Sequence, residues 1–331
     1  MKILVTGGAG FIGSHLCEKL LSEGFDVVSI DNLDPFYDPA IKKSNLRSIQ
    51  SHTRGKHFKD IRLDILDAAK LTKTLKVFKP DAVIHLAALA GVRPSIERPA
   101  DYARVNLEGL FNLLEGCREA GVEKLVFGSS SSIYGNQKKA PFAESDPPSL
   151  PISPYAATKK GGEILCEFYS KSHRMQIAAL RFFTAYGPRQ RPDLAIHKFT
   201  RLMMEDKTIP FYGDGSMKRD YTYVEDIVSG IMAALRWTLK SKKTKGVFEV
   251  FNLGESRSIA LKSMVKTLEK ACGKKAKLQR LPQPSGDVDR TDADIRKAKK
   301  VLGYRPLTDF EKGIDEFVAW YKTKKQVGGA Q

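Results

Sequence analysis

Apolar runs of strand length alternate with amphipathic segments of helix length through residues 1–183. Segments such as 11–24 and 100–121 carry apolar residues at three- and four-residue spacing, which is typical of helices that bury one face. We expect strands over residues 2–7, 25–31, 57–65, 81–88, 123–130 and 175–183. This alternation favours a parallel sheet with helices on both faces.

The pattern changes after residue 183. Polar loops marked by Gly and Pro, such as 186–193 and 211–220, alternate there with short helices and strands. The predicted fold class is α/β: a Rossmann-type, doubly wound parallel sheet with a second, smaller α/β domain. We expect the first domain to span 1–183, with about 223–253 returning to it, and the second to span 184–331.

The composition is ordinary for a globular protein, with 42% of the 331 residues hydrophobic and 28% charged. The opening apolar segment is too short for a signal peptide, and no apolar run long enough to span a membrane follows. The four cysteines (Cys17, Cys117, Cys166 and Cys272) lie far apart and form no CxxC pair. They suit a reducing cytosol and indicate neither zinc nor disulfides. We expect a cytoplasmic protein with no membrane partner.

The formal net charge of +17 has two interpretations. The basic side chains could neutralise nucleic-acid phosphates, or they could form a solvated surface whose field attracts a small anionic substrate. The excess is spread along the chain, and no basic stripe with interleaved aromatic residues is present. The second interpretation is favoured, so no nucleic-acid partner is expected.

The sequence VTGGAGFIG joins the first expected strand to the first helix. It contains G-x-G-x-x-G through Gly8, Gly10 and Gly13, and G-x-x-G-x-x-G through Gly7, Gly10 and Gly13. Glycines let the backbone turn tightly and approach a pyrophosphate, which then sits at the positive N-terminus of the helix. The turn is therefore a candidate dinucleotide site, although a glycine pattern alone is a weak signal.

Acidic residues at the next strand ends strengthen this interpretation. Asp31 ends the second strand, where its carboxylate can accept hydrogen bonds from both ribose hydroxyls. Asn32 follows in place of an arginine, so nothing obvious balances a 2′-phosphate, and NAD is favoured over NADP. Asp64 ends the third strand and either meets the adenine side or caps the helix that follows.

A candidate catalytic pair, Tyr155 and Lys159, lies on a helix opened by Ser153 and Pro154. The i, i+4 spacing puts both side chains on one helix face. A lysine ammonium near the phenol favours the phenolate and lowers the tyrosine pKa from about 10. Such a tyrosine can take up or release the proton of a sugar hydroxyl near neutral pH.

The same YxxxK spacing occurs at two further places. Tyr134 and Lys138 are separated by a Gly-Asn turn signature, so they are not expected to share a helix face. Tyr321 and Lys325 lie on the last amphipathic helix, far from any cofactor motif, and are expected to belong to an ordinary surface helix. Tyr155 is preferred because it follows the strand-end serines of GSSSSIYG at the distance that a shared site requires.

The motifs TGGAGFIG, HLAA, SSSSIYG and YAATK occur in the order of the extended short-chain dehydrogenase/reductase family. Over almost its whole length the chain resembles the NAD-dependent nucleotide-sugar epimerases of that family. The resemblance implies NAD as cofactor, Ser130, Tyr155 and Lys159 as catalytic residues, and a homodimer formed through the long helices near 101–120 and 154–173. The NAD-binding residues that it implies are Gly7, Gly10, Phe11, Ile12, Gly13, Asp31, Asn32, Asp64, Ile65, Leu86, Ala87, Ala88, Asn106, Tyr155, Lys159 and Phe182.

The implied reaction is redox-neutral: the sugar is oxidised at C4, the 4-keto sugar turns, and the hydride returns to its other face. Related dTDP-glucose dehydratases carry an Asp-Glu pair directly after the matching Ser or Thr, and UDP-glucuronate decarboxylases carry a glutamate in that motif. Here Ser131 and Ser132 occupy these positions. A hydroxyl is a poor proton-transfer group near pH 7, so we expect the 4-keto sugar to be returned rather than processed further.

The segments RFFT, YGP and RPD, together with AGVR, look most like those of UDP-glucuronate 4-epimerases. The resemblance implies conversion of UDP-glucuronate to UDP-galacturonate. A uronate needs neutral donors and a cation beside C6, which Ser130, Ser131, Thr184 and Arg191 would supply. Alternatively, Arg191 orders its own loop through Asp193.

The resemblance also implies contacts with the rest of the substrate. Arg219 would bind the diphosphate, with a plain surface charge as the alternative, and Arg93 would meet the diphosphate or the sugar. Tyr212 and Pro210 would border uracil. The remaining expected substrate contacts are Ser132 and Asp287. The six histidines form no metal-ligand cluster, so no metal site is expected.

Two alternatives stay open. Pro94 and Ala185 depart from the pattern of the uronate enzymes, so UDP-glucose or UDP-N-acetylglucosamine 4-epimerisation is the second choice. From another class, the chain could be a catalytically silent NAD-binding sensor on the same fold. The intact Ser130, Tyr155 and Lys159 argue against the sensor.

Overall fold

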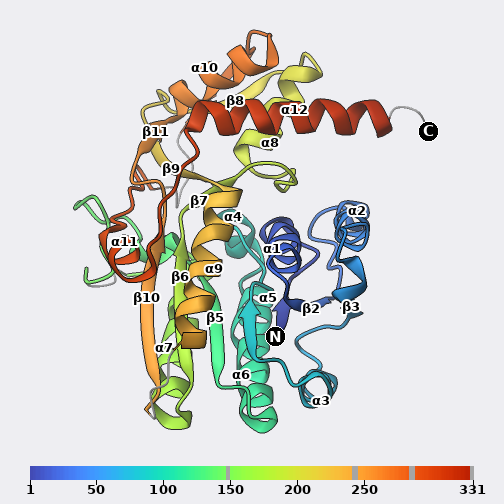
Figure 1. The fold of residues 1–331 in the computed structure, drawn as a ribbon. Coiled ribbons are helices and arrows are strands. Elements are labelled where there is room, and N and C mark those ends of the chain that lie inside the picture. The colour runs from blue at the N-terminus through green and yellow to red at the C-terminus, as the bar shows by residue number, and fades with distance from the viewer. Residues whose placement is uncertain (147–149, 241–244, 283–287, 329–331) are drawn as a thin grey trace.

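The computed structural model describes residues 1–146, 150–240, 245–282 and 288–328. Its centre is a seven-stranded parallel sheet in the order β10-β6-β5-β4-β1-β2-β3 (Figure 1). The strands are β1 (Lys2–Thr6), β2 (Asp26–Asp31), β3 (Phe58–Arg62), β4 (Ala82–His85), β5 (Lys124–Ser130), β6 (Gln176–Phe182) and β10 (Val247–Leu253). The strand order reverses between β1 and β4, where open α/β sheets bind their ligands.

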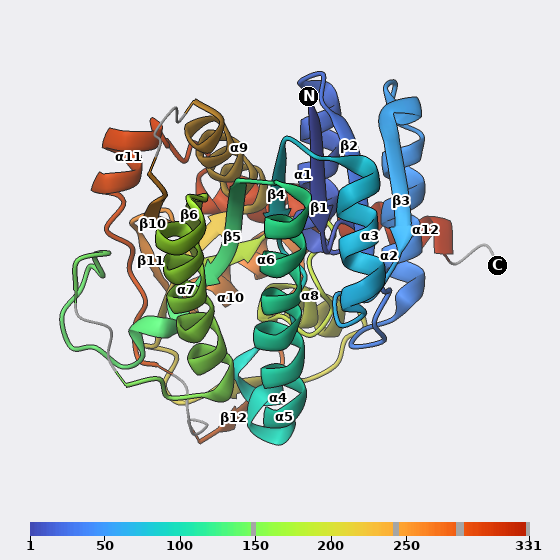
Figure 2. The ribbon, with the colours of Figure 1, turned by 90° about the horizontal axis from the view of Figure 1, so that it is seen from below.

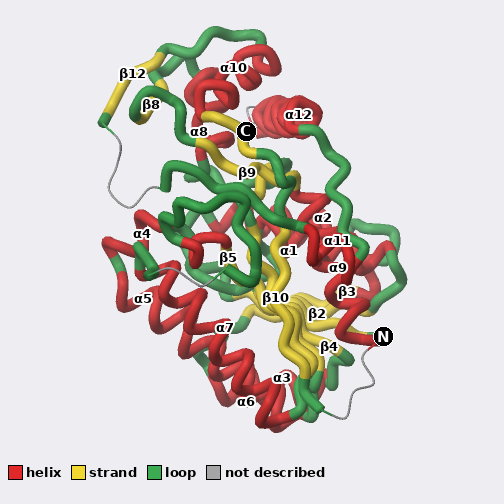
Figure 3. The backbone as a smooth tube through the Cα atoms, turned by 90° about the vertical axis from the view of Figure 1, so that its left-hand side faces the viewer, coloured by secondary structure: helices red, strands yellow, loops and turns green. Residues whose placement is uncertain are grey.

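Helices cover both faces of this sheet (Figures 2 and 3). One layer consists of α3 (Ala68–Phe78), α6 (Gly109–Ala120) and α7 (Pro154–His173). The opposite layer consists of α1 (Phe11–Ser22), α2 (Pro39–Gln50), α9 (Val224–Lys240) and α11 (Arg296–Leu302). Each layer buries its apolar residues against one face of the strands, which are apolar on both faces. The predicted doubly wound α/β fold is confirmed.

The smaller part of the molecule lies at the top of Figure 1. Its strands are β7 (Thr184–Tyr186), β9 (Lys218–Tyr223) and β11 (Ser258–Ala260) in one sheet, and β8 (Ile209–Tyr212) and β12 (Leu278–Leu281) in another. Its helices are α8 (Ala195–Met204), α10 (Leu261–Cys272) and α12 (Phe310–Gly328). A separate aromatic-rich core joins them.

Tyr321 of α12 packs beside Phe317, a member of that core. Its ring is buried and lies 5.5 Å from the His197 ring, centroid to centroid. Tyr321 therefore lies on the buried side of the amphipathic helix α12, where aromatic side chains pack against His197 of α8.

The helix expected over residues 100–121 is divided in three. The short helices α4 (Val92–Glu97) and α5 (Pro99–Ala103) lead into a π-helical turn, Arg104–Glu108, which continues as α6. Turns of this type occur frequently at functional sites, and this one carries Asn106. Two 3₁₀ turns, Gly55–His57 and Ser131–Tyr134, complete the described elements.

None of the described helices is long and apolar enough to cross a membrane. The four cysteines are free thiols, each buried in the fold.

Candidate active site

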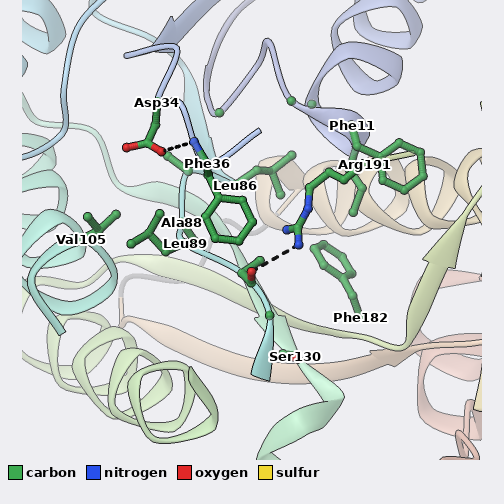
Figure 4. A pocket seen from close by; sticks show the side chains of 18 of the residues that line it. Phe11, Asp34, Phe36, Leu86, Ala88, Leu89, Val105, Ser130, Phe182 and Arg191 are labelled. Atoms are coloured by element: carbon green, nitrogen blue, oxygen red, sulfur yellow. Dashed lines mark hydrogen bonds between the residues drawn. The ribbon is translucent and has the colours of Figure 1, made fainter. Parts of the chain in front are cut away.

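A cavity of about 410 Å³ lies at the carboxyl ends of the central strands (Figure 4). The segments that follow β1, β2, β3, β4, β5 and β6 all contribute to its lining. The cavity thus occupies the reversal point of the strand order. Residues that are far apart in the sequence meet here because parallel strands end at the same edge of the sheet.

The glycine-rich loop forms one wall of the cavity. Gly7 adopts the left-handed conformation with φ 74°, and a Cβ there would lie 2.8 Å from the Ala87 nitrogen. A Cβ on Gly13 would lie only 2.1 Å from the Gly7 oxygen. Gly10, the N-cap of α1, lines the cavity and offers no side chain to the first helical N–H groups. These groups remain available for phosphate oxygens, so the loop fits a dinucleotide.

Asp31 is buried beside this loop. Its carboxylate accepts hydrogen bonds from the backbone N–H groups of Leu33 (2.8 Å) and Ala9 (3.2 Å). Lys42 of α2 brings its Nζ to 3.4 Å from Asp31 Oδ1 and also lines the cavity. Sequence reasoning missed this cation, because only the packing of α2 brings position 42 to the end of β2.

Asp64 lies at the same end of the cavity. Asn32 Nδ2 donates to Asp64 Oδ2 at 2.9 Å, and the Leu66 N–H donates to Oδ1 at 2.9 Å. The helix α3 is capped by Asp67 instead, which accepts from the Lys70 N–H at 3.1 Å. The helix-cap alternative for Asp64 is therefore wrong, and its carboxylate lines the cavity.

Ser130, Tyr155 and Lys159 meet on the opposite wall. Ser130 is the last residue of β5, and its hydroxyl lies near enough to the Tyr155 phenol to act against the rise of its pKa. Ser153 starts α7 by accepting a hydrogen bond from the Ala156 N–H, which places Tyr155 and Lys159 in the first two turns. Lys159 Nζ donates to the Gly128 carbonyl at 2.7 Å. The three side chains all line the cavity.

The pKa of Tyr155 differs from the expectation, which was that Lys159 lowers it. Burial raises the pKa of Tyr155, and the opposing influences are the Ser130 hydroxyl and the positive charge of Arg191. Lys159 Nζ lies 6.0 Å from the Tyr155 ring centroid and is turned towards the carbonyl of Gly128. Burial lowers the pKa of Lys159 to about 8. The positive charge of Arg191 favours the Tyr155 phenolate, and the sequence did not predict this contribution.

Arg191 makes the loop contact with Asp193 that the sequence offered as one of its two roles. Its guanidinium pairs with Asp193 through two hydrogen bonds, of 2.7 and 3.0 Å, and also lines the cavity. Its Nη2, which makes the shorter bond to Asp193, also donates to the Ala90 carbonyl at 3.3 Å, and the guanidinium carbon lies 5.0 Å from the centroid of the Phe36 ring (Figure 4). The loop thus holds the cation in place while leaving it at the cavity wall.

Most of the predicted site residues line this cavity: Gly7, Gly10, Phe11, Ile12, Gly13, Asp31, Asn32, Asp64, Ile65, Leu86, Ala87, Ala88, Ser130, Ser131, Tyr155, Lys159, Phe182, Thr184 and Arg191. Six others lie outside its lining: Arg93, Asn106, Ser132, Pro210, Tyr212 and Arg219. Asp287 lies outside the described residues.

Asn106 and Ser132 lie outside the cavity lining but are hydrogen-bonded to residues that belong to it. Asn106 accepts from the Leu89 N–H at 2.9 Å and donates to the Leu89 carbonyl at 3.0 Å, so it shapes the loop that lines the cavity. The Ser132 N–H donates to Ser130 Oγ at 3.2 Å. The chain turns into a 3₁₀ helix after Ser130, and this turn takes the Ser132 hydroxyl out of the lining.

Arg93 and Tyr212 are brought together at the rim between α4 and β8. The guanidinium of Arg93 lies 4.8 Å from the Tyr212 ring centroid. Arg219, on β9, donates to the carbonyl of Lys218.

Sequence reasoning missed the loop after β2. Asp34, Phe36 and Tyr37 line the cavity because the loop folds back through successive turns. In one of these turns the Phe36 N–H donates to Asp34 at 2.8 Å, as Figure 4 shows. The closely spaced aspartates and prolines of DNLDPFYDP are the signal for such turns.

A Rossmann-type sheet with a Ser-Tyr-Lys group opposite a glycine-rich loop defines a short-chain dehydrogenase/reductase of the extended kind. The family model described as GDP-mannose 4,6 dehydratase matches residues 4–317. The chain belongs to this family, which confirms the resemblance seen in the sequence.

The chain is similar to individual relatives along nearly its whole length. It is 42% identical over 320 residues to a UDP-glucuronate 4-epimerase of Thermodesulfobacterium geofontis, covering 96% of this chain and 95% of that protein. The Bacillus cereus UDP-glucuronic acid 4-epimerase in complex with UDP-glucuronic acid and NAD superposes with a TM-score of 0.89 at 39% identity, covering 98% and 100%. A Thermotoga maritima UDP-glucose 4-epimerase with UDP-glucose gives 0.87 at 32%, covering 98% and 99%.

Proposed function

We propose that this protein is an NAD-dependent UDP-sugar 4-epimerase that interconverts UDP-glucuronate and UDP-galacturonate. The observation that carries the proposal is the distribution of charge around the cavity. A Ser-Tyr-Lys group, neutral hydroxyls and one arginine occupy the end formed by β5, β6 and the loop after β7, and the acidic residues occupy the other end.

That separation favours epimerisation over dehydration or decarboxylation. Among the described residues that line the cavity, the carboxylates are Asp31, the last residue of β2, and Asp34 and Asp64, which follow β2 and β3. Ser130 ends β5, and β4 and β1 lie between β5 and β2. Three strand spacings amount to about 14 Å. The strand order therefore keeps Asp31 and Asp64 away from a sugar held at Ser130, and the end of β5 offers hydroxyls rather than a carboxylate, so the C5 proton and the C6 carboxylate stay in place.

The lining fits the cofactor as described above, with the glycine loop at the pyrophosphate and Asp31 with Lys42 at the adenosine ribose. Bound NAD would accept the hydride from C4 and return it to the opposite face of the same carbon. The relatives crystallised with NAD support this cofactor.

The residues of the chain handle the proton and the orientation of the sugar. Tyr155 takes the proton of the 4-hydroxyl and later gives it back, and Ser130 holds the phenol and the hydroxyl in line. Lys159 keeps one N–H on the Gly128 carbonyl and presents the others to the cavity. Ser131 and Thr184 add neutral hydroxyls, which can bind either face of a sugar that turns between the two transfers.

Arg191 is proposed to recognise the C6 carboxylate, because a guanidinium matches a carboxylate with two parallel hydrogen bonds. Arg191 is already paired with Asp193, and a substrate carboxylate would compete with Asp193 for the guanidinium. This pair favours the second candidate substrates, UDP-glucose and UDP-N-acetylglucosamine, because they carry no carboxylate. The relatives include enzymes of both kinds.

The stack of Arg93 on Tyr212 supports a uridine site at the rim between α4 and β8. We assign uracil to Tyr212 and Pro210, and the diphosphate to Arg219 with Arg93. The division of the chain into a cofactor-binding part, 1–183 with about 223–253 returning to it, and a substrate-binding part, the rest of 184–331, remains a prediction.

The test is to incubate the purified protein separately with UDP-glucuronate, UDP-glucose and UDP-N-acetylglucosamine and to follow the sugars by NMR. We expect UDP-glucuronate to give UDP-galacturonate without release of carbon dioxide. Conversion of UDP-glucose alone would reverse the substrate assignment. No conversion of any sugar, with NAD still bound, would support the silent sensor instead.

A homodimer is also proposed. Phe111 on α6 and Ile164 and Phe168 on α7 are exposed by 47%, 60% and 57%, and these two helices lie side by side on one face of the molecule (Figure 2). An apolar face of this kind suits a second copy of the chain. Light scattering should report a dimer, and Phe168→Asp should report a monomer; a monomeric wild-type protein would contradict the proposal.

The four free thiols suit a cytoplasmic location.

A further inference from the structure

A buried polar row crosses three strands directly behind the catalytic end of β5. Ser129 on β5 pairs in register with Arg181 on β6, and Arg181 pairs with Asn252 on β10. The row stands one residue before the row that contains Ser130. Glu163 of α7 covers it and belongs to the same helix as Tyr155 and Lys159.

The side chains of this row are connected by a continuous series of hydrogen bonds, called here the closed network. Glu163 accepts hydrogen bonds from Ser129 Oγ (2.6 Å) and from two nitrogens of Arg181 (3.0 and 2.8 Å). Arg181 also donates to the Tyr134 hydroxyl at 2.8 Å, which in turn donates to Asn252 Oδ1 at 2.7 Å. The side chains of Glu163 and Arg181 are only 9% and 7% exposed.

Stability alone does not explain such a pair. The desolvation of two charges offsets most of their attraction, and a well-packed apolar pair often serves the fold equally well. The location of Glu163 suggests another role. It lies one helical turn after Lys159, on the same face of α7, and through Ser129 it holds the strand residue next to Ser130.

Glu163 also contributes to the charge around Lys159. The titratable groups facing Lys159 are Tyr155, Glu163 and Cys166 on α7 and His85 on β4. Burial lowers the pKa of His85 to about 3 and raises the pKa of Cys166, so both are neutral near pH 8. The negative charge of Glu163 opposes the effect of burial on the pKa of Lys159.

We propose that the Glu163–Arg181 pair positions the catalytic group: it fixes α7 to the ends of β5 and β6, and its Glu163 carboxylate, partly offset by Arg181, supplies negative charge that helps to keep Lys159 protonated during turnover. Glu163 and Arg181 are positioning residues, since neither lines the cavity. The inference rests on the proposed function, because it gives Lys159 a part in the reaction.

The test compares Glu163→Gln, Arg181→Gln and Glu163→Asp by kcat, KM and pH–rate profile. Glu163→Gln should lower kcat about tenfold with little change in KM, and should move the alkaline limb to lower pH by about one unit. Arg181→Gln leaves the carboxylate without its partner, so the limb should move to higher pH. Glu163→Asp keeps the negative charge on a side chain that is one methylene shorter. Its kcat should fall, and the alkaline limb of its pH–rate profile should stay at the wild-type pH.

The matched control is Glu167→Gln, which breaks an exposed ion pair with Lys171 one turn further along α7 and should leave both kcat and the profile unchanged. A purely structural role predicts lower stability in the variants of the pair without shifts of opposite sign. Folded Glu163→Gln and Arg181→Gln enzymes whose limbs move in the same direction, or not at all, would overturn the proposal.

If either of these variants does not fold, Glu163→Asp decides alone: wild-type kcat in that enzyme overturns the positioning role. The wild-type protein is assayed first. A wild-type protein that converts none of the UDP-sugars contradicts the proposed function, whereas an active one with unaltered variants contradicts only this inference.

Discussion

Tyr134 and Tyr155 are each followed by a lysine four residues later, yet the fold gives them opposite environments. Tyr134 is fully buried, its hydroxyl accepts from Arg181 and donates to Asn252, and burial raises its pKa to about 12. Tyr155 lies near the Ser130 hydroxyl and faces the cavity.

The difference shows that a tyrosine near a cation is not by itself an acid–base group. Both phenols lie close to a positive charge, but the hydrogen-bonding capacity of Tyr134 is taken up by Arg181 and Asn252, so it has no place for a substrate proton. Tyr155 keeps that capacity towards a space where a sugar can lie. The following predictions test how far this contrast extends.

Tyr155→Phe should have the largest effect. Removing the only hydroxyl that this ring presents to the cavity should lower kcat by about 10³-fold, as for other lost acid–base groups. Because the ring is kept, binding of NAD, followed by fluorescence quenching, should change little. A Tyr155→Phe enzyme that retains a tenth of wild-type turnover would remove Tyr155 from the mechanism.

Ser130→Ala should come next. The variant removes the hydroxyl beside the Tyr155 phenol, and a hydrogen bond to a group that becomes charged is worth about 10- to 100-fold in rate. The loss should fall on kcat rather than KM, which initial-rate kinetics at saturating UDP-sugar can separate. A change confined to KM would instead assign Ser130 to substrate binding.

The alkaline side of the pH profile should report Lys159. Since the pKa of this group is lowered to about 8, the ammonium is present below that pH and lost above it. The rate should then fall up to about tenfold per pH unit above pH 8. Lys159→Arg keeps its charge at these pH values, so its profile should stay flat there; an alkaline limb that persists in this variant would assign the titration elsewhere.

Tyr134→Phe should have the smallest effect on the reaction. The variant leaves Asn252 Oδ1 and one nitrogen of Arg181 without their buried partner, which should cost about 1–3 kcal/mol of unfolding free energy. Thermal unfolding should show this loss while kcat falls less than about fivefold. A loss of kcat comparable to that of Tyr155→Phe would mean that the contrast between the two tyrosines is wrong.

Much of this site could be predicted from local patterns. The positions of the strands, the glycine turn and the helix start at Ser153 each depend on residues close in the chain, so spacing and propensity were sufficient. The same holds for Tyr155 and Lys159, whose shared face follows from the geometry of a single helix.

Other parts depended on long-range packing. Lys42 reaches Asp31 only because α2 packs beside β2, and the influence of Arg191 on Tyr155 joins a loop after β7 to the start of α7. The closed network joins Tyr134 to Asn252, which lies 118 residues further along the chain. No pattern within one segment contains such a contact.

The sequence by itself determined the α/β fold, the family and the pair Tyr155 and Lys159, because helix and strand periodicity and short motifs are local properties. Only the tertiary structure decided that Tyr155 faces a cavity and that Tyr134 is buried with its hydroxyl bonded to other side chains. It also decided that the acidic residues of the cavity stand at the far end from Ser130. The reason is physical: burial, hydrogen-bond partners and electrostatic neighbours are set by strands adjacent in the sheet, and the order of those strands differs from their order along the chain.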